Sequence, residues 1–182
     1  MRILGIDPGY AIVGYGIVDY TAGRFAAVHY GAVLTAADAP FEQRILKIYT
    51  ELELVIEKYK PDALSIEQLF FTTNQKTAIA VSQARGVILL AAVKNGIPIY
   101  EYTPLQVKQA VVGYGKAVKQ QVMEMTRIIL NLEKIPKPDD TADALAIAIC
   151  HAHCSGSLIS RTNRISTAKK PLSWEDLYSD KK

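Results

Sequence analysis

Apolar residues change their spacing after residue 40, and this change limits the possible folds more than any other property of the sequence. Before it lie three strand-like runs rich in isoleucine, valine and tyrosine, separated by turn residues, at 2–7, 13–19 and 25–34. After it, helical periodicity alternates with strand-like runs at 63–67 and 97–102. The predicted helices cover 40–59, 77–95, 104–112, 117–132 and a segment from 140 onward. This order predicts an α/β fold, a mixed sheet of five strands with helices on both faces.

Length and composition suit one packed domain with a short appendage. Of the 182 residues, 49% are hydrophobic, and the composition turns polar and basic after Ser155. We therefore expect a folded domain at 1–155 and a basic, flexible tail at 156–182. No apolar run reaches the roughly 20 residues of a membrane-spanning helix, the start lacks a signal-peptide pattern, and two cysteines are too few for a disulfide framework. These features predict a soluble, cytoplasmic protein.

Charge is distributed unevenly along the chain. Lysine and arginine outnumber aspartate and glutamate by six between residues 68 and 137, whereas acids are in excess on both sides of that segment. This pattern is typical of a protein that holds an anionic polymer with one segment and processes it with carboxylates from others. Solvated surface charges also produce differences of this size, so the pattern alone leaves both interpretations open.

Two acidic residues end strand-like runs that are otherwise apolar. Asp7 comes directly before the Pro8-Gly9 turn, and Glu67 follows Ile66. A carboxylate among buried positions is costly unless it is paired or binds a metal, and no basic residue is adjacent to either one. If the two strands are neighbours, the carboxylates meet at one end of the sheet. For Asp7 alone, a turn-forming Asp-Pro-Gly sequence is the simpler explanation.

A second acidic pair begins the last predicted helix. Asp140 and Asp143 are three residues apart, so they lie on one face about one turn from each other. The residues behind them are small or apolar around the whole helix, as expected for a helix buried against the sheet, and the pair would then point at the strand ends. An aspartate at the N-cap with an acid three residues later is also a capping arrangement. For this pair alone, capping and catalysis both remain open.

Together the four carboxylates predict a divalent-metal site. Hard oxygen ligands without histidine or cysteine suit Mg²⁺ or Mn²⁺ better than zinc. Two ions about 3.5–4 Å apart could activate a water and stabilise the leaving oxygen of a phosphodiester. We expect Asp7 to bridge two Mg²⁺ ions, with Glu67 completing one site and Asp140 or Asp143 the other. Mn²⁺ should substitute, and hydrolysis should leave a 5′-phosphate and a 3′-hydroxyl.

A series of short motifs resembles, in order and spacing, the RuvC-type crossover junction endodeoxyribonucleases from about residue 2 to about 155. The motifs are ILGIDPG at 3–9, GYG at 14–16, IEQ at 66–68, QARGV at 83–87, QVKQ at 106–109, VVG at 111–113 and DTADALAIA at 140–148. The resemblance implies a ribonuclease H-like fold, a homodimer, and paired symmetric nicks in four-way Holliday junctions during homologous recombination and DNA repair. It also implies a partner complex for branch migration, of the RuvA and RuvB type.

The resemblance assigns roles to individual residues. The positions that match the family's catalytic, metal-binding carboxylates are Asp7, Glu67, Asp140 and Asp143. Lys108 and Lys119 match basic residues that contact the DNA near the cut, where a cation offsets phosphate charge. Phe70 matches an aromatic residue that stacks on a base near the junction centre. A core position for Phe70 and solvated helix positions for the two lysines are the alternatives.

The chain departs from the family pattern at Asp139-Asp140, where the acidic residue is doubled. Either residue could be the ligand, although the spacing to Asp143 favours Asp140 and leaves Asp139 as a charge at the helix start. The tail, with Arg161, Arg164, Lys169 and Lys170, carries no motif that can be transferred.

The segment from Cys150 to Cys154 raises the question of zinc, because Cys150, His153 and Cys154 share a helix face while His151 does not. Structural zinc sites usually draw on two separated ligand pairs, and the sequence has no second pair. Packing of two small thiols is the preferred interpretation.

Two rival function classes are also considered. The sequence GIDPG at 5–9 is similar to the first phosphate loop of sugar kinases and actin-like ATPases, but 182 residues cannot supply the two related domains that those proteins need. A junction-binding protein that does not cut would lack one or more carboxylates, and all four are present. As dimer surface we expect the helix at 77–95, whose apolar residues exceed what one sheet face needs: Val81, Ala84, Val87, Ile88, Ala91 and Ala92.

Overall fold

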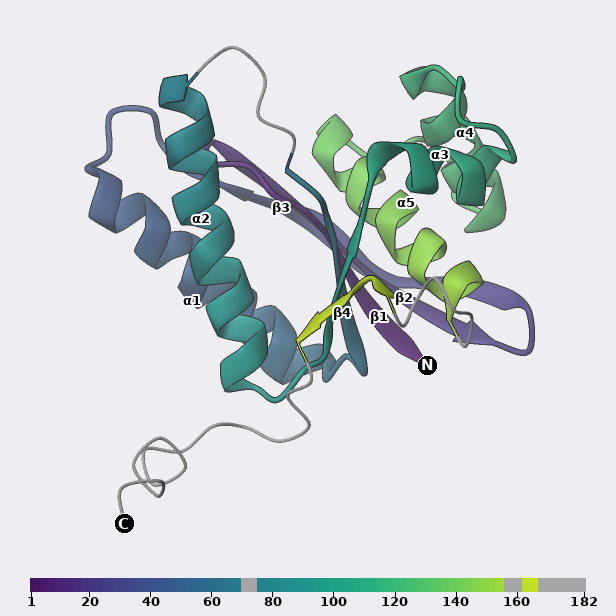
Figure 1. Ribbon diagram of the computed structural model, residues 1–182, viewed down its shortest axis with the longest axis horizontal. Helices are drawn as coiled ribbons and strands as arrows, with labels where there is room; N and C mark the ends of the chain where they lie inside the picture. The colour runs from purple at the N-terminus through teal and green to yellow at the C-terminus, as the bar shows by residue number, and fades with distance from the viewer. Residues whose placement is uncertain (70–74, 156–161, 167–182) are drawn as a thin grey trace.

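A six-stranded mixed sheet forms the centre of the protein in the computed structural model, which describes residues 1–69, 75–155 and 162–166 (Figure 1). The strands follow the order β3-β2-β1-β4-β5-β6 across the sheet. Their bounds are β1 Arg2–Asp7, β2 Ile12–Thr21, β3 Arg24–Leu34, β4 Ala63–Glu67, β5 Ile99–Tyr102 and β6 Arg164–Ser166. The first three are antiparallel neighbours, whereas β4 and β5 run parallel to β1. The predicted hairpins followed by parallel strands are confirmed.

The sixth strand corrects the expected five-stranded sheet. β6 pairs antiparallel with β5, and the Glu101 N–H donates to the Asn163 carbonyl at 2.8 Å. Its three residues are too few to produce a recognisable alternation in sequence. Part of the segment expected to be a tail therefore joins the sheet, and residues 156–161 and 167–182 lie outside the described residues.

In the part of the chain that the structure describes, five helices cover the two faces of the sheet. Their bounds are α1 Phe41–Tyr59, α2 Gln75–Lys94, α3 Pro104–Val112, α4 Lys119–Ile129 and α5 Asp139–Cys154. α1 and α2 lie on one face, and α3, α4 and α5 lie on the other (Figure 1). Each face has its own apolar core, as the prediction of helices on both faces requires. In the described part of the chain, no helix combines the length and the hydropathy needed to span a bilayer.

α5 lies unusually close to the sheet because glycines leave room for its backbone. A Cβ atom at Gly5 would lie 2.0 Å from the Ala144 carbonyl oxygen, and one at Gly14 would lie 1.9 Å from the Asp140 carbonyl oxygen. Such distances are far inside van der Waals contact, so only glycine permits this packing. The helix from Thr141 to Ala152 is buried apart from Asp143. Its beginning is thereby fixed directly above β1 and β2.

Of the two alternatives left open for the aspartates at the start of α5, side-chain capping is not present in the structure. The N-cap residue is Pro138, which makes no side-chain capping bond, and Asp139 and Asp140 lie inside the first turn. The favourable charge at a helix N-terminus remains, but the carboxylates are not used as caps. By contrast, α3 has a side-chain cap, since Thr103 Oγ1 accepts from the Gln106 N–H at 3.2 Å.

Candidate active site

The ends of two neighbouring parallel strands bring Asp7 and Glu67 to the same edge of the sheet. Ile6 of β1 is in register with Ile66 of β4, so the residue that follows each of them lies at the same level. Both strands are buried up to these positions, while the two acids themselves are half-buried. From sequence, Asp7 and Glu67 were expected to meet if their strands were neighbours. The strands are neighbours, and the two carboxylates lie at the same end of the sheet.

The start of α5 brings the other two acids to this edge. Asp7 pairs with Gly14 across β1 and β2, and the Asp140 backbone rests on Gly14. The Thr141 hydroxyl donates to the Gly31 carbonyl of β3 at 3.1 Å, which fixes the first turn of the helix to the sheet. Asp143 follows one turn later, with its side chain 27% exposed. All four predicted carboxylates thus lie at one end of the sheet.

Burial and mutual repulsion disfavour the charged forms of Asp7, Glu67 and Asp143. Burial raises the pKa of Asp7 to about 8, and the charges of Glu67, Asp143 and Asp140 act in the same direction. Burial also raises the pKa of Glu67, with a further contribution from Asp143. The pKa of Asp143 is raised by burial as well, although the hydrogen bond from Lys119 opposes that shift. The cluster therefore holds negative charge that the protein only partly neutralises.

Lys119 supplies the positive charge nearest to this cluster. It is the first residue of α4, where a cation is unfavourable to the helix dipole. Its Nζ lies 2.8 Å from Asp143 Oδ2 and 3.8 Å from Asp139 Oδ2. Burial acts to lower the pKa of Lys119, but the hydrogen bond to Asp143 and the surrounding acids outweigh it and raise that pKa. The lysine stays charged beside the carboxylates.

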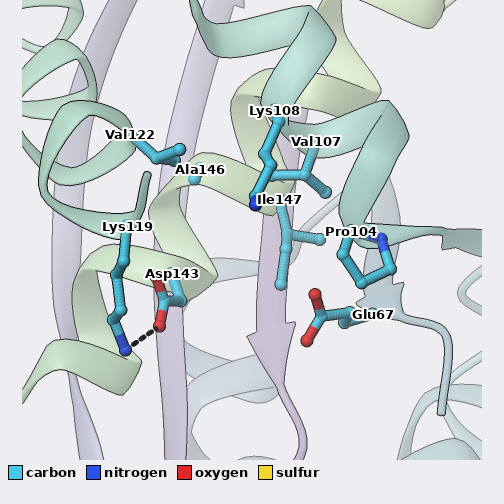
Figure 2. Close-up of a pocket in the computed structure, with 9 residues that line it drawn as sticks. All are labelled: Glu67, Pro104, Val107, Lys108, Lys119, Val122, Asp143, Ala146 and Ile147. Atoms are coloured by element: carbon cyan, nitrogen blue, oxygen red, sulfur yellow. Dashed lines mark ion pairs between the residues drawn. The ribbon is translucent and has the colours of Figure 1, made fainter. Parts of the chain in front are cut away.

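A pocket of about 170 Å³ opens between the acids and helices α3 and α4 (Figure 2). Glu67 and Asp143 line one side of it, and Lys108 of α3 and Lys119 of α4 contribute its basic groups. Its remaining wall consists of apolar side chains, namely Pro104, Val107, Val122, Ala146 and Ile147. Two acids that could bind a metal, Glu67 and Asp143, and two lysines therefore line the same pocket. Phe70, the predicted base-stacking residue, lies outside the described residues.

The donor set fits a hard divalent cation. Four carboxylate side chains without a nitrogen or sulfur donor are the chemistry that Mg²⁺ and Mn²⁺ prefer, and the raised pKa values report uncompensated negative charge there. Among the side chains that the structure describes, no three acids, histidines or cysteines already face one another closely enough to bind an ion. Lys119 is paired with Asp143 instead, so a bound cation requires these side chains to adjust.

The thiol and imidazole groups near the end of α5 are used in packing. His151 is buried, and its Nδ1 lies 2.7 Å from the Tyr102 hydroxyl, while His153 Nδ1 lies 2.9 Å from the Ala110 carbonyl oxygen. Cys150 is buried and not in a disulfide. Cys150 and His151 thus belong to the packed core, whereas His153 is exposed.

Two parts of the site were not predicted from the sequence. Asp139 is bound by Lys137 at 2.6 Å and also approaches Lys119, so it belongs to the ion pairs at the rim. Gly5 and Gly14 set the height of α5 above the sheet. Glycine inside two strand-like runs, together with alanines in the last helix, was the available signal for this close packing.

Comparison with known proteins agrees with this geometry. The family model described as crossover junction endodeoxyribonuclease RuvC matches residues 3–151. The chain belongs to the RuvC family. Its members hydrolyse phosphodiester bonds of DNA at crossovers, so the chain is an endonuclease, and the kinase-like and non-cutting alternatives are set aside.

Individual RuvC proteins are similar over nearly their whole length. The RuvC of Ruminiclostridium cellulolyticum is 58% identical over 161 residues, which cover 87% of this chain and 97% of that protein. The RuvC of Alkaliphilus metalliredigens is 60% identical over 153 residues, covering 84% of this chain and 93% of the relative.

Solved structures place the fold among the ribonuclease H-like resolvases. The structure of Thermus thermophilus RuvC in complex with Holliday junction substrate has a TM-score of 0.83 and 36% identity, covering 94% of this chain and 99% of that one. The yeast mitochondrial Holliday junction resolvase has a TM-score of 0.62 at 15% identity, and this likeness supports the fold alone. The predicted fold class is confirmed, with six strands in place of five.

Proposed function

We propose that this RuvC-family endonuclease resolves four-way Holliday junctions by symmetric nicks, with Mg²⁺ held by Asp7, Glu67, Asp140 and Asp143. The observation that carries the proposal is the convergence of these acids at one sheet edge, where burial, with repulsion from the other acids, raises the pKa of Asp7 to about 8. The junction as substrate is supported by the Thermus thermophilus RuvC structure, which is described as a complex with Holliday junction substrate.

In the pocket, the acids are the proposed metal ligands and the lysines are the proposed phosphate contacts. Glu67 and Asp143 face it from the sheet edge and from α5, so a phosphate in the pocket would lie beside the proposed metal ligands. Lys108 and Lys119 offer ammonium groups that offset phosphate charge not balanced by metal. When bound, Mg²⁺ would activate the attacking water and stabilise the leaving oxygen, with two ions per site as the expected stoichiometry.

Cleavage of a synthetic four-way junction tests this function directly. We expect paired nicks at symmetric positions in opposing strands, with 5′-phosphate and 3′-hydroxyl ends, in the presence of Mg²⁺ or Mn²⁺ and not with EDTA. A linear duplex of the same sequence is the control and should remain intact. Junction binding without symmetric nicks, in the same way with and without EDTA, would contradict the proposal.

The homodimer is part of this proposal, because two equivalent nicks need two equivalent active sites. α2 presents an exposed stripe at Ile79, Gln83, Gly86 and Leu90, with the two apolar side chains 62% and 55% exposed. The dimer surface expected from sequence consisted of other residues of this helix. Four of them are buried in the core of the chain itself, namely Ala84, Ile88, Ala91 and Ala92. The exposed stripe, not the buried one, is therefore the proposed contact surface.

Two further expectations complete the proposal, the first drawn from the family and the second from the sequence pattern. A branch-migration complex of the RuvA and RuvB type is the proposed partner that delivers the junction, and the cytoplasm is the proposed location. Co-purification of the chain with such a complex on junction DNA, compared with duplex DNA, tests the first. Fractionation of cells that express the chain tests the second.

A further inference from the structure

Lys119 lies between two carboxylates of α5 that are one helical turn apart. Its Nζ is 2.8 Å from Asp143 Oδ2 and 3.8 Å from Asp139 Oδ2, and its side chain is 54% exposed. Positions 139 and 143 share a helix face because they are four residues apart. The ion pair with Asp143 lies at the edge of the pocket (Figure 2). The lysine thus has a close partner and a second acid within reach.

The close partner is also a proposed metal ligand, and this creates a conflict. A carboxylate oxygen that coordinates Mg²⁺ cannot keep its full interaction with an ammonium group, since the two cations repel each other. Metal binding at Asp143 therefore weakens the attraction that holds Lys119 there and favours its movement toward another acid. Without another acid nearby, that side chain would be released to solvent, where its many rotamers make a defined phosphate contact costly.

Asp139 is placed to receive this lysine without being a metal ligand itself. Its side chain is 39% exposed, and its Oδ1 is bound by Lys137 Nζ at 2.6 Å, which leaves Oδ2 toward Lys119. The acids that act on the charge of Asp7 are Glu67, Asp143 and Asp140. Asp139 is therefore at the rim of the cluster: it is paired with two lysines, and its charge acts on Asp143 but is not among those that act on Asp7.

We propose that Asp139 is a positioning residue, which takes over the Lys119 ammonium when a metal ion binds Asp143 and so holds that lysine at the edge of the pocket, where the DNA phosphate enters. The inference rests on the proposed assignment of Asp143 as a metal ligand. It gives a role to the doubled acid at 139–140, which the pattern of the family leaves without one.

The affinity of the DNA-free protein for Mg²⁺, measured by titration calorimetry, tests this through a double-mutant cycle. Asp139→Asn should weaken Mg²⁺ binding about fivefold or more in the wild-type background, because Lys119 then loses its second partner. In the Lys119→Met background the same substitution should change the affinity less than about twofold, the effect of one distant charge. Asp139→Glu should restore binding in the wild-type background. Equal weakening in both backgrounds would overturn the proposal, because the effect would then be one of charge alone.

Nuclear magnetic resonance of the Lys119 ammonium group gives an independent readout. With saturating Mg²⁺, the wild-type Nζ signal should stay sharp and shifted, as for an ammonium in an ion pair, whereas in Asp139→Asn it should broaden through exchange with water. A signal that Asp139→Asn leaves unchanged would overturn the proposal. Asp143→Asn separates the two levels of the argument. If it binds Mg²⁺ as the wild type does, the metal assignment fails and the inference with it. If it loses Mg²⁺ but the cycle shows no coupling, the inference alone fails.

Discussion

At the scale of single residues, three acids of the site, Asp7, Glu67 and Asp143, have a cost in folding that their chemistry explains. Burial raises the pKa of Asp7 to about 8, and burial also raises the pKa values of Glu67 and Asp143. Residues shifted in this way by burial and by like charges are typical of functional sites, because a folded protein gains no stability from them. The same repulsion between carboxylates favours the binding of a divalent cation. Metal binding relieves the repulsion that destabilises the metal-free fold.

The raised pKa of Asp7 predicts how stability depends on pH in the metal-free protein. Between about pH 4 and pH 8 the folded state keeps a proton on Asp7 that the unfolded chain has lost, so the free energy of unfolding falls as pH rises through this window. Asp7→Asn should flatten that fall. Melting temperatures in EDTA at pH 5 and pH 8 measure it, and each kcal/mol corresponds to about 2–4 °C in a chain of this size. Identical slopes for the two proteins would argue against a raised pKa.

The same substitution separates catalysis from binding. Asp7→Asn removes charge from the metal site and leaves the lysines in place, so we expect cleavage to fall by about 100-fold or more while junction affinity changes little. Asp38→Asn, a substitution of an exposed acid, is the matched control and should cut normally. Cleavage rates from single-turnover assays and affinities from gel shifts in Ca²⁺ give the two quantities. Near-normal cleavage by Asp7→Asn would remove this residue from the proposed site.

Lys119 should contribute one phosphate contact. Lys119→Ala should weaken junction binding and reduce the slope of log affinity against log salt by about one, because one fewer counterion is released. Lys47→Ala is the control, since Lys47 belongs to α1 on the opposite face of the sheet and is paired there with Glu51 at 3.6 Å. Fluorescence anisotropy over a range of KCl concentrations measures both slopes. Equal slopes in the two variants would contradict a phosphate contact at Lys119.

At the scale of elements, periodicity was enough to predict most of the strands and helices, but not how they converge. The strand ends at Asp7 and Glu67 were visible in sequence, whereas their adjacency depends on the parallel pairing of β1 and β4. β6 was missed because three residues carry no alternation. The ion pairs of Lys119 could not be predicted, because the start of α4 meets α5 only through tertiary packing.

The close packing of α5 on the sheet gives a prediction at this scale. A Cβ atom at Gly14 would lie 1.9 Å from the Asp140 carbonyl oxygen. The contact is with backbone, so it can be relieved only by moving the helix or the strand. We expect Gly14→Ala to lower the free energy of unfolding by about 1–3 kcal/mol or more and to reduce cleavage by moving the first turn of α5. Urea unfolding and junction cleavage measure the two effects.

The control for this prediction is Gly31→Ala on β3. There the nearest atoms to an added Cβ belong to the end of the Tyr15 side chain, with its hydroxyl at 2.9 Å, and a side chain can rotate. The variant should therefore be less destabilised and retain cleavage. Equal losses in both variants would mean that replacing glycine in the sheet is harmful in itself, and not that α5 sets the geometry of the site.

At the scale of the whole molecule, the two faces of the sheet have separate tasks. α3, α4 and α5 surround the pocket on one face, while α2 leaves Ile79 and Leu90 exposed on the other. Such a division allows two copies to associate through α2 without covering either active site, and a two-fold axis there would relate two pockets that cut opposing strands of one junction. Exposed apolar side chains at helical spacing are otherwise a solubility cost without benefit.

Charge placed on this stripe should therefore separate the subunits. Leu90→Glu should shift the protein from dimer to monomer in light scattering at micromolar concentration, because a buried, unpaired carboxylate is costly in an interface. Paired cutting should then become independent nicking, since each monomer acts alone. Ile128→Glu is the matched control, because Ile128 is 53% exposed on α4, on the pocket side of the sheet. If the wild type is a monomer, or if both variants stay dimeric, the contact surface lies elsewhere and the pairing of nicks needs another source of symmetry.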